Sequence, residues 1–252
     1  YLSAGLEEVL QRAIPEAYAP DRYVGLVEND GGPDLELVSF PDGRTAKPAD
    51  QTEAAALIRA WASGTPLTGP ALQRPIILCC TDAKVNACCA RYGFPIYKAL
   101  REQAGVFGFD VMQTTHFGGC HFAPSVIVMP QRSRYGRLTP SEIPQFLETI
   151  SQGRHYLPCF KGRPELNEAE QVAEIAAWGW AEANGYTQQD VKILDVGPVT
   201  NAEATAYAMA GPNQLRIQLG HQSFHMHGTC RSLVEDEGKT VVRVVLKDIA
   251  PV

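Results

Sequence analysis

The placement of the cysteines constrains this chain more than any other feature. It has seven cysteines, and five of them lie between Cys79 and Cys120. A secreted disulfide scaffold is usually short, with an even number of cysteines spread along it. Clustered thiols in a chain of 252 residues, which is long enough to bury a core, are typical of metal binding or redox chemistry. We therefore expect a reducing compartment, either the cytoplasm or a mitochondrial or plastid matrix.

The segment around these cysteines alternates between strand and helix patterns. Short apolar runs predict strands, and apolar residues at helical spacing predict helices. The expected order is strand, helix, strand, strand, helix, at residues 75–80, 87–103, 109–115, 125–129 and 140–150. This order predicts an α/β layer of the thioredoxin-like type.

The flanking segments predict α+β extensions on both sides of this core. On the N-terminal side we expect helices at 2–17 and 52–62, strands at 23–27 and 35–40, and a hairpin turn at Asn29–Gly32. On the C-terminal side we expect a helix at 167–183, strands at 191–196, 215–219 and 240–246, and a short helix or irregular segment at 205–209. The predicted domains are 1–72, 73–160 and 161–252.

Charge and hydropathy exclude two classes of protein. The formal net charge is −6, whereas a general nucleic-acid binder carries a basic surface. No apolar run reaches the roughly 20 residues of a membrane-spanning helix. We expect neither a nucleic-acid partner nor a transmembrane segment.

Four residues are the best candidates for the chemistry: Cys80, Cys89, His116 and Cys120. Cys80 ends the first predicted core strand, and Cys89 lies near the start of the following helix, where the helix dipole favours a thiolate. The other two enclose a Phe-Gly-Gly loop, whose glycines permit unusual backbone angles around a bound group. Thiolate and imidazole ligands suit an iron–sulfur cluster or zinc.

These residues occur in motifs that resemble a known family. The thioredoxin-like 2Fe–2S ferredoxins are similar at Cys80-Thr-Asp, at Cys89-Ala-Arg-Tyr-Gly93 and around His116-Phe-Gly-Gly-Cys120. The sucrase/ferredoxin-like branch is closer, because it also has motifs like Tyr135-Gly-Arg137, Lys161-Gly-Arg163 and Gln171-Val-Ala-Glu174. The resemblance is good over residues 74–178 and weak outside them.

The resemblance implies a 2Fe–2S cluster with two ligands on each iron. The closest branch uses two histidines in the second loop, and the wider ferredoxin group uses two cysteines there. This chain departs from both, because it has His116 and Cys120. The implied ligands are Cys80, Cys89, His116 and Cys120, and the single histidine should raise the reduction potential above that of a four-cysteine ferredoxin.

Several alternatives remain open from the sequence. Cys79 or Cys88 could replace its neighbour as a ligand, and His121 could act as a ligand or as a hydrogen-bond donor to one. A second metal site is conceivable among His221, His225 and His227, although no acidic partner is obvious in the sequence.

The leading functional interpretation is a ferredoxin-like electron carrier or relay subunit that exchanges electrons with a protein redox partner, either alone or within a multi-subunit complex. We expect such a carrier rather than an enzyme. The alternative is a structural subunit of a larger respiratory or photosynthetic complex, which keeps the thioredoxin-like fold without a working cluster or with zinc in the site.

Overall fold

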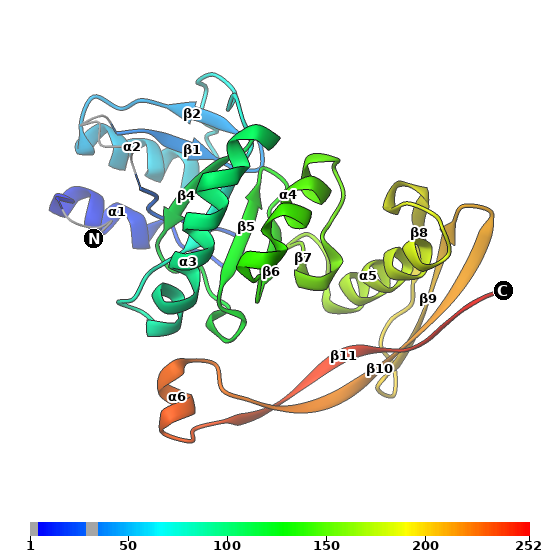
Figure 1. Ribbon diagram of the computed structural model, residues 1–252. Helices are drawn as coiled ribbons and strands as arrows, with labels where there is room; N and C mark the ends of the chain where they lie inside the picture. The colour runs from blue at the N-terminus through cyan, green and yellow to red at the C-terminus, as the bar shows by residue number, and fades with distance from the viewer. Residues whose placement is uncertain (1–4, 29–34) are drawn as a thin grey trace. The chain divides into compact units, whose positions relative to one another are not determined.

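The computed structural model describes residues 5–28 and 35–252, except for the side chain of Cys120 (Figure 1). The chain is a mixed α/β protein that divides into two compact units. The first contains residues up to 132 together with 138–143, and the second contains 133–137 and 144–252. Among the described residues, no helix is long and apolar enough to cross a membrane. The predicted domain boundaries after residues 72 and 160 stay a prediction.

The chain has the predicted order of core elements, and the first four of them lie in the first unit. Strand β3 (Ile76–Cys80) leads into helix α3 (Ala87–Gln103), followed by strands β4 (Asp110–Thr114) and β5 (Ser125–Met129). Strand β3 lies between the other two, parallel to β4 and antiparallel to β5. The predicted final helix follows as α4 (Ile143–Ser151). The α/β layer with the thioredoxin-like order of elements, as expected from the sequence, is therefore confirmed.

Burial explains why the sequence pattern predicted these elements well. Strand β3 is buried over nearly its whole length, as expected for a strand covered on both faces. Helix α3 turns one face inward, and its buried residues recur at helical spacing: Cys89, Gly93, Ile96, Tyr97 and Leu100. Both patterns are local, so they are visible in the sequence.

The N-terminal segment partly departs from the prediction. Helices α1 (Glu8–Glu16) and α2 (Gln51–Ala62) are present and share an apolar cluster. Strand β1 (Leu37–Ser39) is shorter than predicted and pairs with β2 (Arg44–Ala46), which was not predicted. The predicted hairpin turn at Asn29–Gly32 lies outside the described residues.

The strand predicted at 23–27 is wrong, and its apolar residues have a different role. Only an isolated bridge joins Val27 to Thr114 of β4. Backbone bonds of 2.9 Å, from Thr115 N to the Leu26 carbonyl and from Glu28 N to the Gln113 carbonyl, hold the segment along β4. The segment therefore covers hydrogen-bonding groups at the edge of a sheet, which a folded protein must protect.

The second unit contains a four-stranded antiparallel sheet with helix α5 (Glu168–Ala183) packed on it (Figure 1). The strand order is β11 (Lys239–Pro251), β10 (Asn213–Met226), β9 (Glu203–Ala210) and β8 (Val191–Val196). The short helix α6 (Cys230–Val234) lies between β10 and β11 in the chain. Strands β10 and β11 are longer than the predicted 215–219 and 240–246.

The interpretation of residues 205–209 as a short helix or an irregular segment is wrong, because they lie inside β9. Four alanines of β9 are buried at every second position: Ala204, Ala206, Ala208 and Ala210. They pack against a matching row of alanines in α5, at residues 169, 173, 177 and 181. Alanine favours helices in isolation, but here the small side chains allow a helix to pack closely on a sheet, and this packing overrides the propensity.

Two short strands were also missed, and they account for two of the sequence motifs. Strand β6 (Ser133–Gly136) pairs antiparallel with β7 (Phe160–Gly162). Directly after β7, Arg163 forms a hydrogen-bonded ion pair with Glu174 of α5. Gly162 has a φ of +106°, and a Cβ there would overlap the side chain of Gln171. The Lys-Gly-Arg and Gln-Val-Ala-Glu motifs thus join β7 to α5.

A partly buried histidine in this unit, His155, predicts a measurable pH dependence of stability. The His155 ring stacks on Phe160 and Trp178, and burial together with the charge of Arg163 lowers its pKa to about 4. The unfolded chain, with a histidine pKa near 6.5, therefore binds more protons between these two values. We expect this group's contribution to be fully present above pH 6.5 and to be lost as the pH falls toward 4. The loss should be about 1–2 kcal/mol, because the ring is only partly buried.

Urea unfolding from pH 7.5 to 4 in wild type and His155→Phe checks this expectation. Phenylalanine keeps an aromatic ring between Phe160 and Trp178 but cannot bind a proton. The dependence of the unfolding free energy on pH should therefore be shallower in the variant between pH 6.5 and 4. Equal slopes in the two proteins would contradict the assignment to His155, whatever their absolute stabilities.

Candidate metal centre

Two cysteine side chains meet where β3 ends and α3 begins. Cys80 is the last residue of β3, and Cys89 is the third residue of α3. Both are buried and share a small cluster with Phe117. The close approach of helix and strand depends on Gly93, because a Cβ at this position would lie within 3.0 Å of the Cys80 carbonyl oxygen. The turn of helix between Cys89 and Gly93 therefore lies directly against the end of β3.

A third side chain, that of His116, lies close to these two cysteines and comes from the loop just after the neighbouring strand β4. Cys80 and Thr114 are paired in the parallel register of β3 and β4, so the carboxyl ends of both strands lie at one edge of the sheet. The Nδ1 atom of His116 lies 3.9 Å from Sγ of Cys80 and 3.8 Å from Sγ of Cys89. Ligand atoms of all three residues fall within 4.8 Å of one another.

The loop that carries His116 is held by hydrogen bonds on both sides. Its backbone N–H donates to Asp82 Oδ2 over 3.3 Å, and its carbonyl accepts from the Tyr23 hydroxyl. The next residues include Gly118 and Gly119, with φ values of +92° and +76°. The expectation that these glycines adopt unusual backbone angles is confirmed, and such angles are costly for other residues.

The local electrostatics favour a thiolate at Cys80. The thiol of Cys89, the backbone N–H of Asp82 and the His116 ring together lower the pKa of Cys80 to about 6, despite the opposing effect of burial. In contrast, burial raises the pKa of the neighbouring Cys79, which lies outside the group. Successive side chains of a strand point to opposite faces, so only one of the two adjacent cysteines can face this group.

The remaining candidates lie as follows. Cys88 is not a member of the group. The ring of His121 packs on Phe122, with centroids 4.0 Å apart. The backbone of Cys120 begins the short 3-10 helix Cys120–Phe122, whereas its side chain lies outside the part of the chain that the structure describes. The assignment of Cys120 as a ligand stays a prediction.

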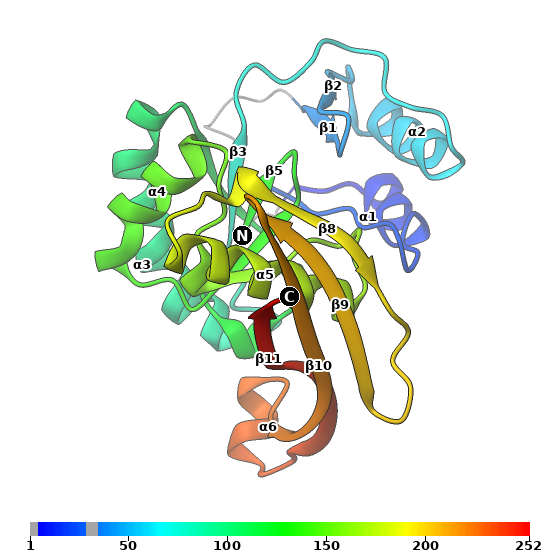
Figure 2. The same cartoon turned by 90° about the vertical axis from the view of Figure 1, so that its right-hand side faces the viewer.

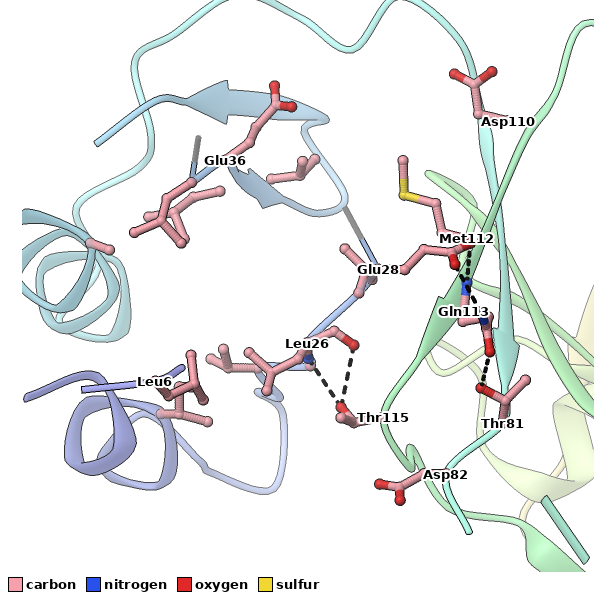
Figure 3. A pocket seen from close by; sticks show the side chains of 18 of the residues that line it. Leu6, Leu26, Glu28, Glu36, Thr81, Asp82, Asp110, Met112, Gln113 and Thr115 are labelled. Carbon is pink, nitrogen blue, oxygen red and sulfur yellow. Dashed lines mark hydrogen bonds between the residues drawn. The ribbon is translucent and has the colours of Figure 1, made fainter. Parts of the chain in front are cut away.

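A network of polar side chains next to the group was not predicted from the sequence. Glu28 accepts hydrogen bonds from the backbone and the side chain of Gln113, at 3.1 and 2.9 Å (Figure 3). It also accepts one from the hydroxyl of Tyr97. Gln113 in turn accepts from the hydroxyl of Thr81 over 2.9 Å. The network thus fixes the residue that follows Cys80. Only the Cys-Thr-Asp motif hinted that residues beside the cysteine matter.

Two hollows adjoin this region. The larger, of about 1250 Å³, separates the N-terminal helices from β4 and is lined partly by Leu26, Thr81 and Thr115 (Figure 3). The smaller, of about 270 Å³, is lined by His116, Asp82 and the stacked rings of Tyr18 and Tyr23, among others. Because His116 is only half-buried and borders this hollow, its ring can be approached from outside.

Fold and site together define an α/β protein with a thioredoxin-like core and a candidate Cys/His metal centre. A family model described as sucrase/ferredoxin-like matches residues 14–162, and the chain belongs to this family. A comparison with curated proteins found no match.

The chain is also similar to solved structures of a thioredoxin-like [2Fe-2S] ferredoxin from Aquifex aeolicus. One has 15% sequence identity and a TM-score of 0.34, over 37% of this chain and 94% of the ferredoxin. The wild-type ferredoxin in another structure has 15% identity and a TM-score of 0.33, over 36% and 100%. A cysteine-to-serine variant has 16% identity and a TM-score of 0.33, over 35% and 99%.

Proposed function

We propose that this chain is an electron-transfer protein that carries a 2Fe–2S cluster held by Cys80, Cys89, His116 and Cys120. The observation that carries the proposal is the convergence of two buried thiols and one imidazole within 4.8 Å. This donor set fits the cluster, because iron–sulfur centres take thiolate ligands and accept histidine in place of cysteine. When bound, the cluster would supply one-electron oxidation and reduction.

The protein's own residues support this role in three ways. The lowered pKa of Cys80 favours the thiolate that a cluster needs. Asp82 and Tyr23 hold the backbone of His116 on both sides, which fixes the ligand loop. The imidazole of His116 is half-buried and borders the smaller hollow, and a histidine ligand can couple electron transfer to proton transfer.

The proposal extends to the setting in which the protein acts. We infer a protein redox partner, either a single protein or a multi-subunit complex, and a reducing compartment such as the cytoplasm or an organelle matrix. In this view residues 73–160 form the ferredoxin domain, and residues 1–72 and 161–252 serve as flanking α+β segments.

Zinc is the second candidate for the site, and one observation favours it. Zn–S and Zn–N bonds of about 2.3 and 2.0 Å in a tetrahedron put sulfur and nitrogen about 3.5 Å apart. The two measured sulfur–nitrogen distances are 3.9 and 3.8 Å, so a single ion would need little rearrangement. With zinc, the centre would stabilise the fold of a structural subunit and would transfer no electrons.

Spectroscopy of anaerobically purified protein separates these two candidates. Two irons per chain, a red-brown colour and a rhombic EPR signal after reduction would support the 2Fe–2S cluster. One zinc per chain in a colourless protein would support the structural role. A protein with neither metal would contradict both and would leave a scaffold subunit as the remaining interpretation.

Replacing the histidine ligand should change the reduction potential. In His116→Cys, a neutral ligand becomes an anionic thiolate, which stabilises the oxidised cluster. We expect the potential to fall by about 100 mV or more and to lose most of its dependence on pH. Protein-film voltammetry from pH 6 to 9 measures both effects, with His121→Ala as a control that should leave them unchanged. An unaltered potential in His116→Cys would remove His116 from the ligand set.

A further inference from the structure

A second group of metal-binding side chains lies in the C-terminal unit. Strands β10 and β11 form a long hairpin, and helix α6 lies at its far end (Figure 2). Three side chains at this end have ligand atoms within 4.8 Å of one another: His225, His227 and Asp236. His225 lies near the end of β10, His227 directly follows that strand, and Asp236 follows α6. The sequence alone offered no acidic partner for these histidines, because the turn through α6 is what brings Asp236 back to them.

One of the histidines is held in the orientation that a metal ligand needs. The Nδ1 atom of His227 lies 2.8 Å from the carbonyl oxygen of Ser232, and only a protonated Nδ1 can bond to a carbonyl. The unprotonated Nε2 then has a lone pair, and it lies 4.0 Å from Oδ1 of Asp236. A hydrogen bond from the non-coordinating ring nitrogen to a carbonyl is typical of histidines that bind metals.

The second histidine occupies space that a glycine leaves free. A Cβ at Gly238 would lie within 3.0 Å of His225 Nε2 and of the His227 ring. The two imidazoles are 5.2 Å apart between centroids and nearly perpendicular. The backbone therefore passes close to both rings at Gly238, where a residue with a side chain would not fit. This close passage keeps both imidazoles near Asp236.

We propose that His225, His227 and Asp236 bind a divalent first-row transition ion, for which zinc is the best match. Two imidazole nitrogens and one carboxylate oxygen are a common donor set for zinc, which completes its tetrahedron with water. His225 and Asp236 are exposed, so an ion can enter from solvent. The site is built from residues of the second unit alone.

Zinc titration of chelator-treated full-length protein by isothermal calorimetry tests this proposal. Wild type should bind one more zinc per chain than His227→Ala, whatever binds at the cysteine centre, because that contribution is common to both proteins. Asp236→Asn, which barely changes side-chain size, should lower the affinity for this additional zinc ion at least 10-fold. His221→Ala is the matched control, since His221 is on the same strand but outside the group, and it should bind zinc like wild type.

Cobalt provides an independent readout. The proposed donors contain no sulfur. The difference between the Co²⁺ spectra of wild type and Asp236→Asn should therefore show d–d absorption without a thiolate charge-transfer band. The proposal is overturned if wild type, His227→Ala and Asp236→Asn bind the same number of zinc ions with equal affinity. It is equally overturned if His221→Ala loses as much zinc as they do, because the effect would then be non-specific binding to exposed imidazoles.

Discussion

A Cys89→Ser variant is expected to lose the proposed 2Fe–2S cluster almost completely, so that the iron content falls from about two irons per chain to less than a tenth of that value. Serine is close to cysteine in size, but its hydroxyl is a hard and weakly acidic ligand that iron–sulfur clusters rarely retain. Cys89 is buried beside Cys80, so solvent has little access to its sulfur, and a water molecule cannot easily replace it. Iron analysis and visible absorption of anaerobically purified protein measure the loss.

Cys79, the neighbour of Cys80 in the sequence, provides a matched control for this variant. Cys79 is as buried as Cys80, precedes it on the same strand and lies outside the group. Cys79→Ala should therefore keep its iron and its colour, with a modest decrease in stability from the lost side chain. If Cys79→Ala loses iron as completely as Cys89→Ser, the loss reports general disruption of the core, and the ligand assignment fails.

Gly93→Ala is expected to lower the free energy of unfolding by about 2 kcal/mol or more. In an ordinary helix this substitution stabilises by up to about 1 kcal/mol, because alanine has the higher helix propensity. Here the added methyl group would lie within 3.0 Å of the Cys80 carbonyl oxygen, which belongs to backbone and cannot rotate away. Helix α3 must move outward, which separates Cys89 from Cys80 and should also reduce the bound metal.

Urea unfolding of Gly93→Ala beside Gly105→Ala measures this effect. Gly105 follows α3 in the 3-10 helix Ala104–Phe107, and a Cβ there meets nothing within 4 Å. Gly105→Ala should therefore change the stability by less than about 0.5 kcal/mol. Two variants of equal stability would mean that the contact between α3 and β3 adapts without cost and does not set the spacing of the two cysteines.

The sequence predicted the surroundings of the cysteines well because the relevant signals are local. The apolar run of β3, the helical spacing in α3 and the two glycines after His116 each act within a few residues. The choice between Cys79 and Cys80 was less accessible. It depends on which face of β3 meets the start of α3. Alternation along a strand shows that the two cysteines point to opposite faces, but it does not show which of them faces the site.

Other features were invisible because their causes lie far apart in the chain. Strand β9 resembles a helix in composition, and only its packing against α5 makes it a strand. Residues 23–27 have a strand-like pattern, but they form no regular strand of their own. Backbone hydrogen bonds instead hold this segment along the edge of β4.

The sequence by itself thus determined the α/β order of the core, the family and the residue types available for a metal centre. The tertiary structure decided which of those residues meet. Parallel pairing of β3 and β4 places His116 beside Cys80, Gly93 lets Cys89 approach them, and the β10–β11 hairpin returns Asp236 to two histidines. Periodicity specifies local conformation over a few residues, whereas these juxtapositions arise from strand pairing and close packing between segments that are distant in sequence.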